Sequence, residues 1–225
     1  MDRRPPLRRG AAPLPQARAL APLLRRVAGL ALALEAEDPA LAELIEQLKA
    51  ADKALSAQLP ADLRPRMTET ARLPESTRIP ESTGDRVYLD HSHDIGAYNP
   101  CFPEYEVTVD GDRAIGTVEF PLAFEGPPGL VHGGALSLFF DAVIQQHNCE
   151  LGIAGKTVSL HVDYRRPTPL LRPLEFAVEH AVDGSRSTST ARLYSGAREC
   201  CTATVVAVAA DVSRLPGVAP RRTGP

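Results

Sequence analysis

The stretch GLVHGGALSLFFDAV, residues Gly129–Val143, places an apolar helix directly after a histidine and two glycines. Its second half has the apolar pattern of a core helix, interrupted by one carboxylate, Asp141. Gly133 and Gly134 stand where the helix begins, and the first N–H groups of a helix have no partner inside it. An acid inside an apolar helix is costly to bury without a partner or a role. The stretch therefore predicts a buried helix that carries functional groups.

Strand-like segments flank this helix on both sides. Before it, Glu104–Asp110 and Arg113–Phe120 alternate polar and apolar residues around a short turn, which predicts a hairpin. After it come four more such segments, Lys156–Tyr164, Pro173–Val182, Ser187–Ser195 and Glu199–Ala210. Short turns join the last three, so we expect them to run antiparallel. One helix among six strands predicts an α+β fold in which the sheet curls around the helix.

Residues 1–72 predict a helical hairpin that precedes this domain. Ala19–Glu37 has apolar residues at helical spacing, and Asp38 with Pro39 is a typical N-cap and first-turn pair. The two apolar stripes are Leu20, Leu23, Leu24, Val27 and Leu30, then Leu41, Leu44, Ile45, Leu48, Leu55 and Leu59 before Pro60. Such a stripe should cover either the main domain or a second copy of the chain.

Residues 73–86 contain the sequence PEST twice, a composition that cannot support a core and predicts a linker. The expected organisation is an extension over 1–72, a linker over 73–86, a main domain over 87–212 and a disordered tail over 213–225.

The composition excludes several classes of protein. The chain has 225 residues, is 44% hydrophobic and carries a formal net charge of -3, which predicts a packed core and disfavours nucleic acid as a partner. No apolar run reaches the roughly 18 residues that cross a bilayer. Four cysteines without a CxxC pair indicate reduced thiols in a cytoplasmic protein. The Arg-rich start lacks a signal-peptide core, although a transit peptide stays open.

No metal or cofactor is expected. The segment DHSHD, residues 90–94, holds two histidines between acids, but its spacing is not that of a helical metal site and no complete ligand set stands elsewhere.

Three features at matching spacings identify a family resemblance. They are HGG at 132–134, Asp141 nine residues after His132, and the pattern T-x-x-L-x-x-x-Y-x-R-P over 157–167. Together they resemble the hot-dog fold acyl-CoA thioesterases of the PaaI-like group, over roughly residues 98–210. The resemblance implies a hot-dog fold, hydrolysis of an acyl-CoA thioester to a free acid and CoA, and two sites at a dimer interface.

The resemblance also implies roles for individual residues. Asp141 suits a general base that activates water, or a nucleophile, and the Gly133 N–H suits a donor to the oxyanion. Thr157 matches a threonine that holds the substrate or the attacking water in related enzymes, with Ser159 in the same strand as the alternative. His132 is expected mainly to pin the loop before the helix.

The spacing of the two main groups predicts a dimer. Gly133 and Asp141 are eight residues apart, about 12 Å along a helix. One reacting carbonyl cannot lie within about 3 Å of both. The donor and the acid of one site should therefore come from different chains, in a homodimer or a dimer of dimers.

Further residues are candidates for substrate binding. Gln145, one turn after Asp141, can orient the water or the thioester, or be a surface amide. Arg165 and Arg166 suit the phosphates of coenzyme A, or are solvated surface residues. The remaining candidates are Gly134 at the helix start and Asn99, in a segment expected to line the acyl pocket.

A second function stays open at this point. Phe139 and Phe140 are bulkier than the residues of many relatives and would narrow or close the pocket. The alternative is therefore a non-catalytic acyl-CoA-binding or assembly protein with the same fold. A hot-dog hydratase ranks last, because the motifs of those relatives are missing.

Overall fold

A computed structural model describes residues 7–9, 13–59, 69–72, 87–89, 92–151, 155–183 and 186–209. The expected linker at 73–86 and the expected tail at 213–225 lie outside the described residues.

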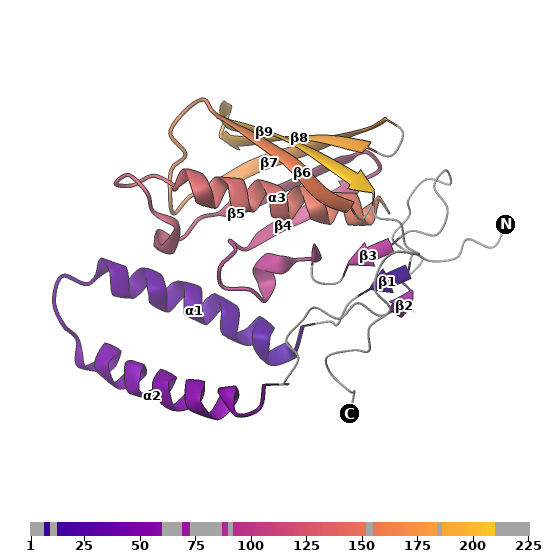
Figure 1. The fold of residues 1–225 in the computed structure, drawn as a ribbon. Coiled ribbons are helices and arrows are strands. Elements are labelled where there is room, and N and C mark those ends of the chain that lie inside the picture. Colours follow the sequence, from indigo (N-terminus) through magenta and orange to yellow (C-terminus); the bar gives the residue numbers. More distant parts are fainter. Residues whose placement is uncertain are drawn as a thin grey trace.

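Six antiparallel strands form one sheet in the order β4-β5-β7-β8-β9-β6. Their bounds are β4 Tyr105–Asp110, β5 Arg113–Glu119, β6 Gly155–Tyr164, β7 Pro173–Asp183, β8 Arg186–Ser195 and β9 Arg198–Ala209. The sheet curves over one long helix, α3 (Gly133–Glu150), as Figure 1 shows. The predicted order of strands and helix, and the antiparallel pairing of the last three strands, are confirmed. β4 and β6 are the two edges of the sheet.

The core lies between α3 and the concave face of the sheet. Phe139 and Phe140 are completely buried there. The Phe139 ring packs edge-to-face against Tyr105, Phe120 and Phe176, with centroid distances of 5.2 to 5.9 Å. Such aromatic pairs stabilise a core beyond their buried area. The two phenylalanines therefore fill the interior of the domain.

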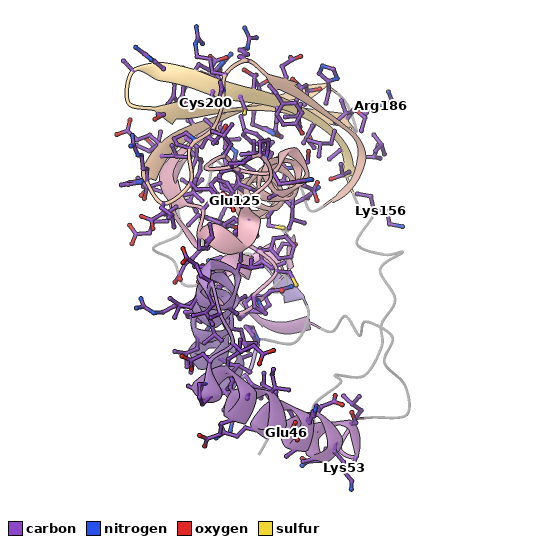
Figure 2. The ribbon with its side chains drawn as sticks, turned by 90° about the vertical axis from the view of Figure 1, so that its left-hand side faces the viewer. Glu46, Lys53, Glu125, Lys156, Arg186 and Cys200 are labelled. Carbon is purple, nitrogen blue, oxygen red and sulfur yellow. The ribbon has the colours of Figure 1, made fainter. Side chains whose placement is uncertain are left out.

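Two helices, α1 (Pro15–Ala33) and α2 (Pro39–Ser56), form the predicted hairpin, with α1 between the main domain and α2 (Figures 1 and 2). The predicted cap is present: the Asp38 side chain accepts a hydrogen bond from the Ala40 N–H at 2.8 Å. The first helix runs earlier than the expected Ala19–Glu37, starting with Pro15 in its first turn, where proline's fixed φ suits a helix.

α1 contacts the main domain through a different face from its leucine stripe. Its buried residues are Ala21, Arg25 and Gly29, spaced four apart. Leu23 and Leu30 of the stripe are 60% and 56% exposed. The small residues Ala21 and Gly29 let α1 approach the main domain closely. A Cβ on Gly29 would stand 3.6 Å from Leu122 in η3 (Leu122–Phe124). Within this chain, the closest packing of α1 on the main domain therefore uses Ala21, Arg25 and Gly29 rather than the leucine stripe.

A small three-stranded sheet, not predicted from the sequence, joins distant segments. Its order is β2-β1-β3, with β1 Leu7–Arg9, β2 Glu69–Arg72 and β3 Val87–Leu89. Its strands come from both sides of residues 73–86, so backbone pairing ties the extension to the start of the main domain. Strands of three or four residues leave too short a pattern to recognise in a sequence.

Candidate active site

Asp141, Thr157 and Gln145 form one chain of hydrogen bonds between α3 and β6. The Thr157 hydroxyl donates to Asp141 Oδ1 at 2.8 Å, and Gln145 Nε2 donates to Thr157 Oγ1 at 2.6 Å. The helix holds Asp141 and Gln145 one turn apart on the same face. All three residues are half-buried. Asp141 Oδ2 has no hydrogen-bond partner among the described residues, so it can accept a proton from a water molecule.

A β-bulge in β6 selects Thr157 over Ser159. Thr157 pairs with Ala207 and Ser159 with Val206, so the register shifts across Val158. A bulge places two residues opposite one and reverses the alternation of faces. Thr157 therefore points toward α3, whereas Ser159 is exposed. Of the two alternatives that the sequence left open, Thr157 is the one that contacts Asp141.

His132 caps the start of α3. Its Nδ1 accepts a hydrogen bond from the Gly134 N–H at 2.9 Å, which requires this ring nitrogen to be unprotonated. The Gly134 amide is thereby occupied. The Gly133 N–H, at the first helical position, has no acceptor among the described residues. It is an available donor at the positive end of the helix dipole.

Tyr164 holds the carbonyl group of Gly133 in place. Its hydroxyl donates to the Gly133 carbonyl at 2.9 Å and lies 3.1 Å from Ser137 Oγ, which also donates to that carbonyl at 3.2 Å. A Cβ on Gly133 would stand 3.2 Å from the Tyr164 ring. Within the chain, the glycine thus accommodates this tyrosine. Sequence reasoning gave Tyr164 and Ser137 no role, although Tyr164 belongs to the quoted motif and Ser137 follows Gly133 by one turn.

The other binding candidates lie apart from this hydrogen-bonded chain. Arg165 Nε is 2.9 Å from Glu199 Oε1, and Arg166 donates to the Glu199 carbonyl at 2.8 Å, so both stand beside the start of β9. The Asn99 side chain accepts from the Cys101 N–H at 3.0 Å and shapes the loop before β4. Among the described residues, none of these three side chains forms a hydrogen bond with Asp141, Thr157 or Gln145.

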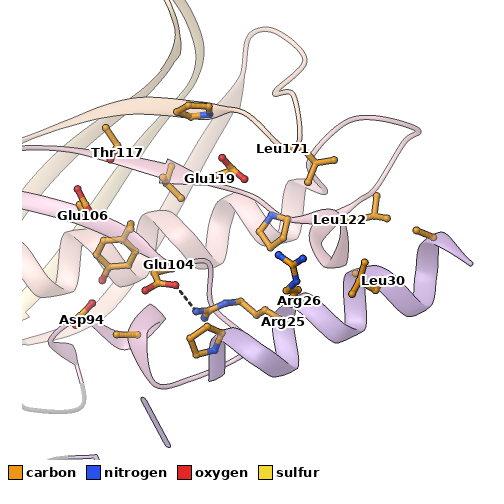
Figure 3. Close-up of a pocket in the computed structure, with 18 residues that line it drawn as sticks. Arg25, Arg26, Leu30, Asp94, Glu104, Glu106, Thr117, Glu119, Leu122 and Leu171 are labelled. Carbon is orange, nitrogen blue, oxygen red and sulfur yellow. Dashed lines mark hydrogen bonds and ion pairs between the residues drawn. The ribbon is translucent and has the colours of Figure 1, made fainter. Parts of the chain in front are cut away.

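A pocket of about 980 Å³ lies between α1 and strands β4 and β5 (Figure 3). Arg25 lines it and pairs with Glu104 at 3.2 Å. Apolar residues such as Leu30, Leu122 and Leu171 form much of the wall. Asp141, Thr157 and Gln145 are not among its lining residues, so this space is separate from the candidate active site.

A buried polar cluster occupies the C-terminal half of α3. His147 Nε2 lies 3.2 Å from the Gly111 carbonyl, and His180 Nδ1 lies 3.0 Å from Ser189 Oγ, which donates to Asn148 Oδ1. Burial lowers the pKa of His147. Burial, and then the neighbouring His147, lower the pKa of His180 to about 4. Both rings are therefore neutral near pH 7.

The described residues hold no group of three or more histidine, cysteine or acidic side chains arranged for a metal ion. Asp90 and His91 of the DHSHD segment lie outside those residues. Within the described part of the chain, every helix is too short or too polar to span a bilayer.

Comparison with known proteins agrees with this architecture. Residues 125–208 match the family model of the acyl-CoA thioesterase N-terminal domain. A crystal structure of a thioesterase superfamily protein is 26% identical and has a TM-score of 0.61, covering 90% of this chain and 98% of its own. Residues 125–208 are therefore similar to a thioesterase domain. The hot-dog fold expected from the sequence is confirmed.

Two further solved structures match a little under half of this chain. A hypothetical thioesterase from Streptococcus pneumoniae, solved with coenzyme A, is 20% identical, with a TM-score of 0.45, over 47% of this chain and 88% of its own. Thioesterase superfamily member 2 from Mus musculus is 11% identical, with a TM-score of 0.43, over 46% and 80%.

Proposed function

We propose that this chain is an acyl-CoA thioesterase of the PaaI-like group, which hydrolyses an acyl-CoA to a free acid and CoA. The observation that carries the proposal is the hydrogen bond from Thr157 to Asp141 Oδ1, which leaves Oδ2 open to water. The family match over residues 125–208 supports the reaction class. Phe139 and Phe140 are completely buried in the core, so the non-catalytic alternative that rests on their bulk is decided by the activity test below.

In the proposed mechanism, Asp141 Oδ2 accepts a proton from water, whose oxygen attacks the thioester carbonyl carbon. The carbon–sulfur bond then breaks, and the CoA thiolate leaves and is protonated. Direct attack by Oδ2 would instead form a mixed anhydride that water hydrolyses, and this route needs the same carboxylate. Thr157 holds Oδ1, and Gln145 orients the Thr157 hydroxyl.

The Gly133 amide of a second copy is proposed to stabilise the oxyanion. Gly133 begins α3 and Asp141 lies about two turns further along it, too far apart for one carbonyl. Thr157 lies on β6, an edge strand of ten residues. Long edge strands are ready to pair with another chain. Pairing along β6 would bring the second copy beside Asp141 and give a homodimer, or a dimer of dimers.

Coenzyme A, part of the proposed substrate, also carries phosphates that need cationic partners. Arg165 and Arg166 stand near the end of β6, and the Arg165 side chain is 55% exposed despite its contact with Glu199. We propose that they bind the phosphates of coenzyme A, that Gly134 lines the cleft and that Asn99 shapes the acyl pocket. The four cysteines are free thiols, which supports a cytoplasmic location.

The test is release of CoA thiol from a panel of short, medium and aromatic acyl-CoAs. Asp141→Asn should lower kcat by about 100-fold or more, because it removes the base. Asp163→Asn, the same substitution at an exposed carboxylate on β6, is the matched control and should keep full activity. Equal hydrolysis by Asp141→Asn would refute the proposal. Tight binding of acyl-CoA by the wild-type protein without turnover would support the non-catalytic alternative.

A further inference from the structure

Both halves of the proposed active site are hydrogen-bonded to the same strand, β6. The Thr157 hydroxyl donates to Asp141 Oδ1 at 2.8 Å, and the Tyr164 hydroxyl donates to the Gly133 carbonyl at 2.9 Å. Thr157 lies near the start of β6, and Tyr164 is its last residue. The strand therefore holds the acid near one end and the glycine near the other.

β6 is an edge strand beside α3 (Figure 1), and within the described chain it pairs with β9 alone. Its ten residues contain no proline that would interrupt a second ladder of hydrogen bonds. Of the four large hydrophobic residues that are exposed among the described residues after 59, two lie on this strand, Val158 and Tyr164. A long edge strand of this kind is a template for pairing with another chain.

Asp141 and Gly133 lie about two turns apart on α3, so a site that contains both groups needs a second copy of the chain. Two copies of β6 that pair about a two-fold axis perpendicular to the sheet run antiparallel, and every contact between them occurs twice. If Tyr164 of one copy lies opposite Thr157 of the other, their Cβ atoms are about 4.5–5.5 Å apart. Gly133 of one copy then approaches Asp141 of the other. This pairing rests on the proposed function, which requires both groups in one site.

The β-bulge at Val158 makes such a register possible. Residues directly opposite each other in an antiparallel pair point to the same face of the sheet. Leu160 and Val162 pack against the core, so strict alternation would direct Tyr164 inward. The same alternation would direct Thr157 outward. The extra residue reverses the alternation, and both Thr157 and Tyr164 point toward α3.

We propose that β6 pairs with β6 of a second copy in the register that places His161 opposite itself. When the bulge is counted as one position, Thr157 lies three positions before His161 and Tyr164 three positions after it. Tyr164 of each copy therefore faces Thr157 of the other. In each site, Asp141 and Thr157 come from one copy, whereas Gly133 and the Tyr164 that holds its carbonyl come from the other.

Single cysteines on the outer face of β6 test this register in the full-length protein. His161, Ser159 and Asp163 are exposed, so each can be replaced without disturbing the core. The parent protein carries Cys101→Ser, because Cys101 is the exposed one among the four cysteines. In the proposed register, His161→Cys faces its symmetry mate within the Cα separation that a disulfide needs, about 4.4–6.8 Å.

Ser159→Cys and Asp163→Cys are the matched controls. Each lies four positions along the strand from its symmetry mate, about 13 Å away, which is too far for a disulfide. When these two variants are co-expressed, however, they should cross-link to each other, because Ser159 faces Asp163 in this register. Circular dichroism checks that all the variants fold.

We expect mild oxidation to convert most of the His161→Cys protein, and little of either control alone, into a covalent dimer on non-reducing electrophoresis. Self-cross-linking of Ser159→Cys or Asp163→Cys instead would move the two-fold axis to that residue and overturn the register. Absence of a covalent dimer in every variant and in the co-expressed pair would overturn the pairing.

CoA thiol release separates failure of this interface from failure of the proposed reaction. Loss of activity in Asp141→Asn without a cross-link in His161→Cys would refute the interface and leave the reaction standing. A cross-link in His161→Cys together with full activity in Asp141→Asn would support the register and refute the reaction.

Discussion

A single hydroxyl joins the carboxylate of Asp141 to the amide of Gln145. The Thr157 hydroxyl bonds to both groups because its oxygen accepts a hydrogen bond from Gln145 while its proton is donated to Asp141. The family resemblance implied roles for Asp141 and Thr157, and Gln145 was a candidate because it follows Asp141 by one turn. The sequence could not choose between Thr157 and Ser159, because the bulge at Val158 leaves no clear signal in the residue pattern.

Thr157→Val removes this hydroxyl while keeping the branched shape. The variant should lose about 10- to 100-fold in kcat, the value of one hydrogen bond to a charged group. Ser159→Ala is the comparison and should retain its activity, since Ser159 is exposed away from Asp141. Steady-state thiol release measures both variants, and a larger loss in Ser159→Ala would contradict the assignment.

His180 gives the protein a predicted sensitivity to acid. Its pKa in the folded state is lowered to about 4 by burial and then by His147, against an ordinary value of about 6.5. Between these values the unfolded chain binds more protons, so the free energy of unfolding falls as the pH decreases from about 6.5 to about 4. Asp112 nearby opposes the shift without cancelling it.

The measurement is urea unfolding at several pH values across this window. His180→Gln removes the titrating ring, and its unfolding free energy should decline less steeply than that of the wild type as the pH decreases. Parallel curves for the two proteins would show that His180 does not cause the decline. This cluster could not be predicted from the sequence, because polar residues at the end of an apolar helix have the pattern of a solvated face.

At the scale of elements, the hairpin was predictable but its contacts were not. Leucine spacing and the pair Asp38–Pro39 identify two helices. Nothing in that pattern shows that Ala21, Arg25 and Gly29 form the packed face, because a buried arginine contradicts the usual expectation for a charged residue. The carbonyl groups that satisfy Arg25 come from a loop more than seventy residues away.

Arg25→Ala should detach α1 from the main domain. It leaves the carbonyls of Gly96, Asn99 and Phe102 without their donor, at a cost of about 1–3 kcal/mol for buried unpaired groups. Limited proteolysis should cut the hairpin from the variant faster than from the wild type. Arg26→Ala, an exposed neighbour, is the control and should be cut at the wild-type rate. Equal rates for Arg25→Ala and the wild type would show that other contacts hold α1.

At the scale of the whole molecule, the order of strands and helix along the chain follows from the alternating patterns, and it is confirmed. The assembly does not follow in the same way. One chain supplies the hydrogen-bonded carboxylate of Asp141 and the N–H of Gly133, but these two groups lie about two turns apart on α3. In the proposed dimer, a complete site depends on how two copies meet along the edge strand β6.

The most direct test of the two-copy site is complementation between two inactive variants. Gly133→Pro removes the N–H at the first helical position, which accepts proline because His132 before it is extended with ψ 134°. Its partner in the test is Asp141→Asn. Each variant alone should lose about 100-fold or more in activity. Gly133→Ala is the control for the added Cβ, which would stand 3.2 Å from the Tyr164 ring, and it keeps the N–H.

When the two variants are co-expressed, half of the dimers should be mixed. Each mixed dimer has one site with both the intact glycine amide and the intact aspartate, so we expect about a quarter of the wild-type rate of acyl-CoA hydrolysis. A rate for the co-expressed mixture no higher than that of either variant alone would contradict a site shared between two copies.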